Sequence, residues 1–93
     1  MKISGKQVTA ARDLLGITQE ELATAAGVAW TTVLRFEGGQ TEPQRASLEK
    51  ILAELERRGI EFTNGTGIGI HLNYEKAAEF ARSKAQAGSA SDK

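Results

Sequence analysis

Cysteine is missing from this chain of 93 residues, so neither a disulfide framework nor a cysteine-based zinc site is possible. Proline occurs once, and aromatic side chains make up only 5% of the residues. No apolar run approaches the ~20 residues that a membrane-spanning helix needs. The N-terminus also lacks the apolar core of a signal peptide. These absences predict a cytoplasmic protein without a membrane partner.

The chain also has no net charge, because 12 Lys and Arg residues balance 12 Asp and Glu residues. The chain therefore lacks the overall positive field that would by itself indicate nucleic-acid binding. A glycine-rich phosphate loop and a nucleophile elbow are also absent. The single histidine, His71, has no second metal ligand that the sequence places beside it. We expect no enzyme, no metal site and no cofactor.

The most informative segment runs from Thr18 to Gly39. Its first half has helical spacing around Leu22 and stops at Gly27, a residue that readily adopts the left-handed backbone found at helix C-termini. Val33 and Phe36 then mark the inner face of a second short helix, expected over residues 30–37. Two short helices joined by a sharp turn form a helix-turn-helix.

Further helices are expected on both sides of this unit. The first runs from about residue 5 to 15 with Ser4 as its N-cap, and Thr18 and Glu21 form a capping box at the start of the next. After the helix-turn-helix, the clearest amphipathic period in the chain comes from Leu48, Ile51, Leu52 and Leu55. Gly59 is the expected C-cap of that helix.

From residue 60 the apolar period changes from helical to two, which predicts a short β-hairpin over residues 60–73 with its turn at 64–67. A two-stranded ribbon is marginal in water, so its apolar side chains need cover from the bundle or from a second subunit. We therefore expect a homodimer through this segment. The dimerisation residues would be Ile60, Phe62, Ile68, Ile70 and Leu72. A weak helix over residues 74–86 and a disordered tail over 87–93 complete the chain.

The chain resembles the lambda repressor and Cro group, or XRE family, over roughly residues 4–58. The matching residues are Arg12, Gln19, Leu22, Ala23, Gly27, Val33, Phe36, Glu37, Gly38 and Gly39. The resemblance implies a mainly α fold, a lambda-repressor-like bundle of four to five helices, with the short hairpin following it. Residues 1–59 would then be the DNA-binding domain.

The resemblance also implies which residues contact DNA. The second helix of the unit would enter the major groove, and Arg35 can bond two acceptors of guanine at once. The expected DNA-binding residues are Gln19, Trp30, Thr31, Thr32, Arg35, Gln40, Thr41 and Arg45. Arg12 matches an arginine that pairs with the glutamate closing the recognition helix, here Glu37, so these two are expected to form a structural ion pair.

Two functions remain open. The first is a sequence-specific transcriptional regulator, expected to act as a repressor, that binds double-stranded DNA at a palindromic operator as a homodimer. The second is an antiactivator or antitoxin-like fold that holds another regulatory protein through Trp30 and Leu34. Ala29, which stands where Ser or Thr usually caps the recognition helix, and the apolar pair favour the second. Trp30 could instead pack on the core.

Overall fold

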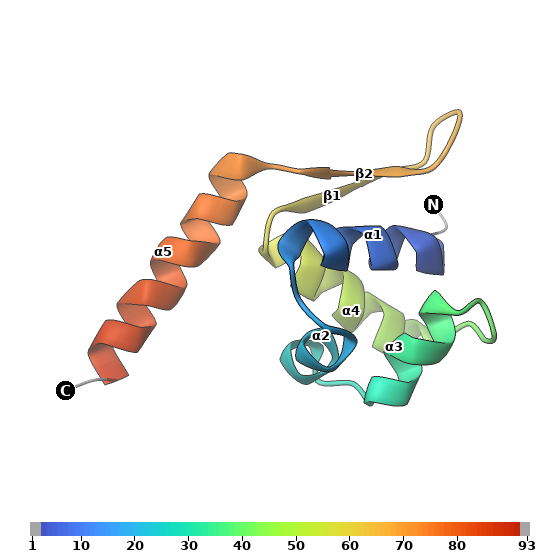
Figure 1. The fold of residues 1–93 in the computed structure, drawn as a ribbon, viewed down its shortest axis with the longest axis horizontal. Helices are drawn as coiled ribbons and strands as arrows, with labels where there is room; N and C mark the ends of the chain where they lie inside the picture. Colours follow the sequence, from blue (N-terminus) through green and yellow to red (C-terminus); the bar gives the residue numbers. More distant parts are fainter. Residues whose placement is uncertain (1–2, 92–93) are drawn as a thin grey trace.

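The structure, a computed structural model, describes residues 3–91, with side chains described through residue 85. These residues form five helices and one antiparallel hairpin (Figure 1). The elements are α1 (Gly5–Leu15), α2 (Gln19–Ala26), α3 (Trp30–Glu37), α4 (Arg45–Arg57), β1 (Ile60–Thr63), β2 (Gly69–Leu72) and α5 (Tyr74–Ser91). This confirms the expected fold class. Within the described residues, no helix has the length and apolar character needed to cross a bilayer.

The first two helices begin with complete capping boxes. The Ser4 side chain accepts a hydrogen bond from the Gln7 amide, and the Gln7 side chain accepts one from the Ser4 amide. Thr18 and Glu21 exchange the same two bonds at α2, at 3.0 and 2.8 Å. Each pair of bonds satisfies two backbone N–H groups that would otherwise lack partners. Capping by Ser4 and by Thr18 and Glu21 is therefore confirmed.

The core lies among α1, α2, α3 and α4 and continues beneath the hairpin. Its residues are Ile3, Val8, Ala11, Leu22, Ala23, Val33, Phe36, Ile51, Leu55 and Ile60. Burying one large aliphatic side chain of this kind contributes about 1.5–3 kcal/mol. Ala23 is almost fully buried where α2 crosses its neighbours, and its small side chain lets the helices approach closely.

The hairpin pairs β1 with β2 and lies across α1 and α4 (Figure 1). Its register places Ile60 opposite Leu72 and Phe62 opposite Ile70, so these four side chains share one face. That face packs on the core, since Ile60 is buried and the other three are partly buried against it.

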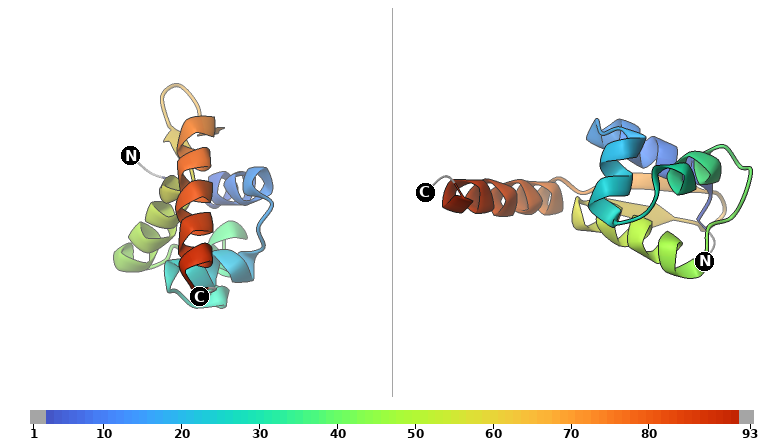
Figure 2. Two further views of the ribbon diagram at one scale, coloured as in Figure 1. Left: turned by 90° about the vertical axis from the view of Figure 1, so that its left-hand side faces the viewer. Right: turned by 90° about the horizontal axis from the view of Figure 1, so that it is seen from below.

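The C-terminal helix differs from the expectation. Helix α5 continues to Ser91, whereas residues 87–93 were expected to be a disordered tail; residues 92–93 lie outside the described residues. The small polar residues near its end suggested disorder, but alanines are interspersed among them, and alanine has the highest helix propensity. Figure 2 shows α5 running away from the bundle.

The first turns of α5 are anchored to the end of α4. The guanidinium groups of Arg57 and Arg58 lie 4.7 and 4.8 Å from the centre of the Phe80 ring, a cation–π arrangement. Both arginines also hold the buried carboxylate of Glu54, at 2.8 and 2.7 Å. The end of α4 thereby connects the bundle to α5.

The sequence predicted Gly59 as the C-cap of α4, and this prediction is wrong. Arg58 occupies that position in ordinary right-handed geometry, and Gly59 follows it with a φ of 110°. A Cβ on Gly59 would lie 2.9 Å from the backbone nitrogen of Ala77. Glycine is therefore needed here because the start of α5 passes close to its backbone. A pattern that marks a helix end does not reveal this long-range contact.

Candidate nucleic-acid interface

The turn between α2 and α3 is set by Gly27. This residue has a left-handed backbone, with φ at 75°, and its N–H donates to the carbonyls of Ala23 and Thr24. Helix α2 therefore ends at Ala26, and α3 starts three residues after Gly27. The arrangement is the helix-turn-helix that the sequence predicts.

Helix α3 turns one face to the core and the other to solvent. Val33 is fully buried and Phe36 is nearly so. At 100° per residue, the opposite side of the helix runs from Trp30 through Leu34 and Thr31 to Arg35. All four side chains on that side are exposed, with Trp30 at 47% and Leu34 at 41%. Trp30 therefore does not pack into the core.

A polar groove lies beside the Arg35 edge of this face, between α3 and the start of α4. Its lining residues are Thr31, Thr32, Arg35, Thr41, Pro43, Gln44 and Ser47. None of these side chains is acidic, and four of them carry hydroxyl groups. Hydroxyl and guanidinium donors in a lining that contains no carboxylate suit the phosphate backbone of a duplex.

Neither α3 nor α4 has a side-chain cap. The N-cap of α3 is Ala29, as the sequence shows, and that of α4 is Gln44, whose side chain makes no capping bond. Helix N-termini carry unpaired backbone N–H groups and a partial positive charge, both favourable to anions. These two ends lie at the groove, where they add positive potential without adding charged side chains.

Two backbone amides of the loop after α3 are used within the protein. The amides of Gly39 and Gln40 donate to the carbonyls of Phe36 and Arg35 and so complete the helix end. The side chains of Gln40 and Thr41 are exposed, and Thr41 lines the groove. Gln40 can therefore reach DNA only through its side chain.

Arg45 lies at the first position of α4, with its side chain 91% exposed. It pairs with Glu49 one turn later, at 3.4 Å. Such a fully solvated pair is worth little, so it leaves the arginine available to another anion.

Beneath α3, Arg12 and Glu37 form a bidentate ion pair. The Nε and Nη2 atoms of Arg12 donate to the two carboxylate oxygens at 2.7 and 2.8 Å, and Nη1 donates to the carbonyl of Ile17 at 3.0 Å. The side chains are 14% and 5% exposed. The pair joins α1 to the end of α3.

Two more side chains bind the same carboxylate. Thr9 Oγ1 and Gln19 Nε2 each donate to Glu37 Oε1 at 3.0 Å. Burial raises the pKa of Glu37, but the hydrogen bonds from Arg12, Gln19 and Thr9 outweigh it, so that the pKa lies below its ordinary value. The hydrogen bond to Glu37 in turn raises the pKa of Arg12. Gln19, expected to contact DNA, is thus held by the protein itself through its amide nitrogen.

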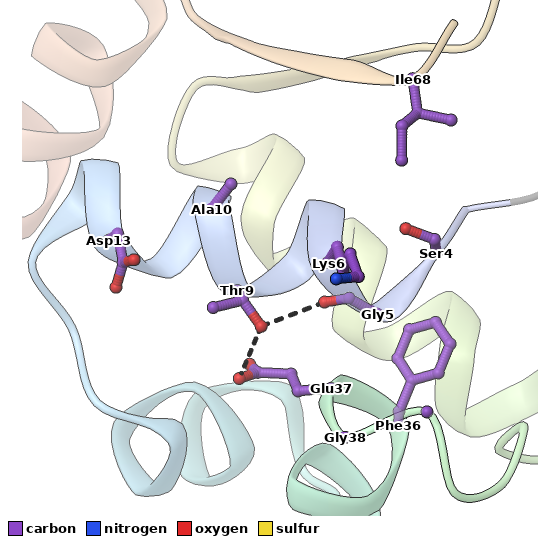
Figure 3. A pocket seen from close by; sticks show the side chains of 11 residues that line it. Ser4, Gly5, Lys6, Thr9, Ala10, Asp13, Phe36, Glu37, Gly38 and Ile68 are labelled. Carbon is purple, nitrogen blue, oxygen red and sulfur yellow. Dashed lines mark hydrogen bonds between the residues drawn. The ribbon is translucent and has the colours of Figure 1, made fainter.

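Figure 3 shows where α1 passes the end of α3, with Thr9 bonded to both Gly5 and Glu37. Gly5 is needed at this crossing, because a Cβ there would lie 2.1 Å from the carbonyl oxygen of Phe36. In the sequence, Gly5 stands as an ordinary first residue of a helix. No local signal marks it, because its constraint comes from a helix 31 positions further along.

Gln7 is a second residue that the sequence analysis missed. It is 2% exposed, and its Nε2 donates to the carbonyls of Gly69 and Thr63, at 2.9 and 3.3 Å, and to the Asn64 side chain. The sequence predicted Ser4 as an N-cap, but it did not predict the part of Gln7, whose bonds to the hairpin join segments far apart in the chain. Gln7 fixes the hairpin on α1.

The expected dimerisation residues are not equally accessible. Ile60 is 1% exposed and belongs to the protomer's own core, so it is not available to a second subunit. The period-two pattern shows that Ile60 lies on the apolar face of the hairpin, but it does not show whether the bundle or a second subunit covers that face. Phe62, Ile70 and Leu72 are partly buried, and Ile68 at the turn is 58% exposed.

Metal ligation finds no support in the described part of the chain, where no group of three or more His, Asp or Glu side chains could hold an ion. His71 lies 3.9 Å from Glu61 on the exposed face of the hairpin.

Comparison with known proteins agrees with this architecture. A family model described as helix-turn-helix matches residues 8–62. An uncharacterised helix-turn-helix-type transcriptional regulator of Haemophilus influenzae is 44% identical over 50 residues, which cover 54% of this chain and 51% of that protein. The chain thus matches about half the length of this curated relative. Since the family model covers more than half of the chain, the resemblance seen in the sequence is confirmed, and the chain belongs to the helix-turn-helix family.

Proposed function

We propose that this protein is a DNA-binding transcriptional regulator that recognises a specific duplex sequence through α3. The observation that carries the proposal is the exposed face of α3 beside a polar groove without carboxylates. The name of the Haemophilus influenzae relative supports it. Binding rather than catalysis is the mechanism.

In this mechanism α3 lies in the major groove, where its early residues reach base edges. Arg35 donates two bonds to guanine, which provides ~1 to 3 kcal/mol of discrimination, and Thr31 reaches a neighbouring base. Thr32, Thr41 and the uncapped end of α4 contact phosphates and set the register. Gln40 and Arg45 are placed at the edge of that contact.

We further propose that two copies bind a palindromic operator with half-sites about one helical turn apart, and that occupancy of a promoter represses transcription. The two-stranded sheet has an open edge on each side, and an exposed edge can pair with a strand of another chain. Phe62, Ile70 and Leu72 are only partly buried, and Ile68 adds exposed apolar surface at the turn.

Selection of bound duplexes from a random pool tests this function. An enriched palindrome, bound by the wild-type protein and lost with Arg35→Ala, is the expected result. Because each subunit brings few positive side chains to the duplex, affinity should fall only modestly as salt rises. Failure to enrich any duplex at low ionic strength would contradict the proposal.

A second candidate function is favoured by the exposure of Trp30 and Leu34. In it, the same face holds another regulatory protein, as apolar side chains often do at protein interfaces. Trp30 is the only tryptophan, so its fluorescence reports on this face directly. A change with duplex DNA that salt reverses supports the first function, whereas a change only with a partner protein supports the second.

A further inference from the structure

The outward face of α3 has two rows of different chemistry. Trp30 and Leu34 are one turn apart and form an apolar row, while Thr31 and Arg35, also one turn apart, form a polar row beside the groove. Residues four positions apart on a helix are neighbours, so each row presents a continuous strip. Base recognition by hydrogen bonds can use only the polar row.

The apolar row is unusual for the described part of this protein. Five large apolar side chains are exposed there, namely Leu14, Trp30, Leu34, Ile68 and Tyr74. Two of the five stand side by side on the helix that would enter the groove. The core of the protein does not bury Trp30 and Leu34. A ligand that buries these two side chains therefore gains the hydrophobic free energy of removing them from water.

Base edges in the major groove offer one apolar group to such a strip. Guanine, adenine and cytosine present hydrogen-bonding atoms there, whereas thymine presents its C5 methyl group beside a single acceptor. An aromatic ring and a leucine can bury that methyl, but they cannot satisfy a donor or acceptor of another base. The chemistry of the apolar row therefore selects thymine.

We infer that Trp30 and Leu34 read thymine methyl groups, so that each half-site carries thymine opposite this row and guanine opposite Arg35. The inference rests on the proposed DNA-binding function and names its ligand. Thymine and guanine positions should be adjacent in the half-site, because the two rows lie side by side on one helix.

Deoxyuridine substitution tests the inference with the wild-type protein, since deoxyuridine pairs like thymine but lacks the methyl group. Each thymine of the selected duplex is replaced singly. At the positions that face the apolar row, affinity should fall about fourfold per methyl, the effect expected for burying one such group. Replacement outside the contacted bases should change nothing.

Two variants assign the methyl contact to the apolar row. In Trp30→Ala and Leu34→Ala, the deoxyuridine penalty should vanish at the contacted position. Leu14→Ala is the matched control, because Leu14 is an exposed leucine on α1, at 52%, and its variant should keep the full penalty. Thermal unfolding of each variant confirms that it folds.

The outcomes separate the inference from the function on which it rests. Tight binding to a selected duplex with no deoxyuridine effect anywhere would overturn the inference and leave the regulator function standing. An enriched half-site without thymine, or unchanged duplex affinity in both alanine variants, would overturn it as well. If no duplex is enriched, the proposed function fails and the inference fails with it.

Discussion

Helices α1 and α2 differ from α3 and α4 in the way their first turns are satisfied. The first two begin with reciprocal capping boxes, and both donate side chains to Glu37. The other two begin at Ala29 and Gln44 without a side-chain cap. The uncapped ends lie beside the polar groove, where a nucleic-acid backbone would supply the missing acceptors.

This difference separates the parts of the bundle that provide stability from those that are available for binding. The α1 and α2 pair is closed by internal hydrogen bonds around Glu37. The α3 and α4 pair has no side-chain cap at either helix start, and its exposed hydroxyl groups line the groove. A change in the network around Glu37 should therefore destabilise the protein strongly, while a change at the exposed residues of α3 beside the groove should alter binding at nearly constant stability.

The largest expected effect comes from Arg12→Ala. Removing one partner of a mostly buried ion pair leaves the carboxylate of Glu37 uncompensated and commonly costs ~3 to 5 kcal/mol. Urea unfolding should show this loss. Arg45→Ala is the control, because its pair with Glu49 is solvated and its loss should cost no more than ~1 kcal/mol. A normal melting temperature for Arg12→Ala would overturn the structural role of the pair.

Acid should also weaken this network, because it protonates the carboxylate of Glu37. The pKa of Glu37 lies below the ordinary value of 4.5, so the stability it provides is complete above that pH and is lost as the pH falls through the lower, folded-state pKa. Denaturation curves between pH 5 and pH 2 should show this decline. The Glu37→Gln variant should decline less steeply.

Two other carboxylates also have a pKa below their ordinary value. Hydrogen bonds from Thr18 lower the pKa of Glu21, and those from Lys76 lower the pKa of Glu61. Both remain in the Glu37→Gln variant, so the difference between the two pH profiles isolates Glu37. Identical profiles would show that this carboxylate does not contribute to the acid sensitivity.

Arg35→Lys addresses the binding side of the comparison. Lysine keeps the charge but cannot make the two parallel bonds of a guanidinium, so affinity for the selected duplex should fall by ~1 to 3 kcal/mol. Selectivity at one base position should relax, while the melting temperature should stay within about one degree of the wild type. An equal loss for every base at that position would assign Arg35 to phosphate instead.

The smallest expected effect tests the missing cap directly. Ala29→Ser adds an acceptor for the first turn of α3 and should stabilise the protein by up to ~1 kcal/mol, whereas Thr18→Ala should destabilise it by a similar amount. Differential scanning calorimetry resolves both shifts. If Ala29→Ser brings no gain, the first turn of α3 already has its amides satisfied, and the contrast between the two helix pairs is weaker than proposed.

Much of the bundle follows from local chemistry that a sequence displays. Capping residues at Ser4 and Thr18 and the glycine at 27 mark helix ends, because the groups they satisfy lie within one turn. The outward position of Arg35 follows from helical periodicity once Val33 and Phe36 are assigned to the core. These inferences need no knowledge of distant contacts.

The remainder depended on contacts between segments far apart in the chain. The constraint on Gly5 comes from α3, and that on Gly59 comes from α5. Ile60 was assigned to a dimer contact because periodicity shows which face is apolar but not what covers it. Gln19 matched a position that contacts DNA, yet Glu37 engages its amide nitrogen. A local sequence pattern does not show whether such a side chain binds DNA or another part of the protein.

The amide of Gln7 gives the chain a particular order of assembly. Its acceptors on the hairpin lie 56 to 62 positions downstream. During translation α1 leaves the ribosome long before those carbonyls exist, so this polar group must stay hydrated or find temporary partners until residue 69 emerges. Nascent chains that stop short of the second strand should therefore leave the Gln7 amide exposed to water, even though Arg12 and Glu37 already join α1 to α3.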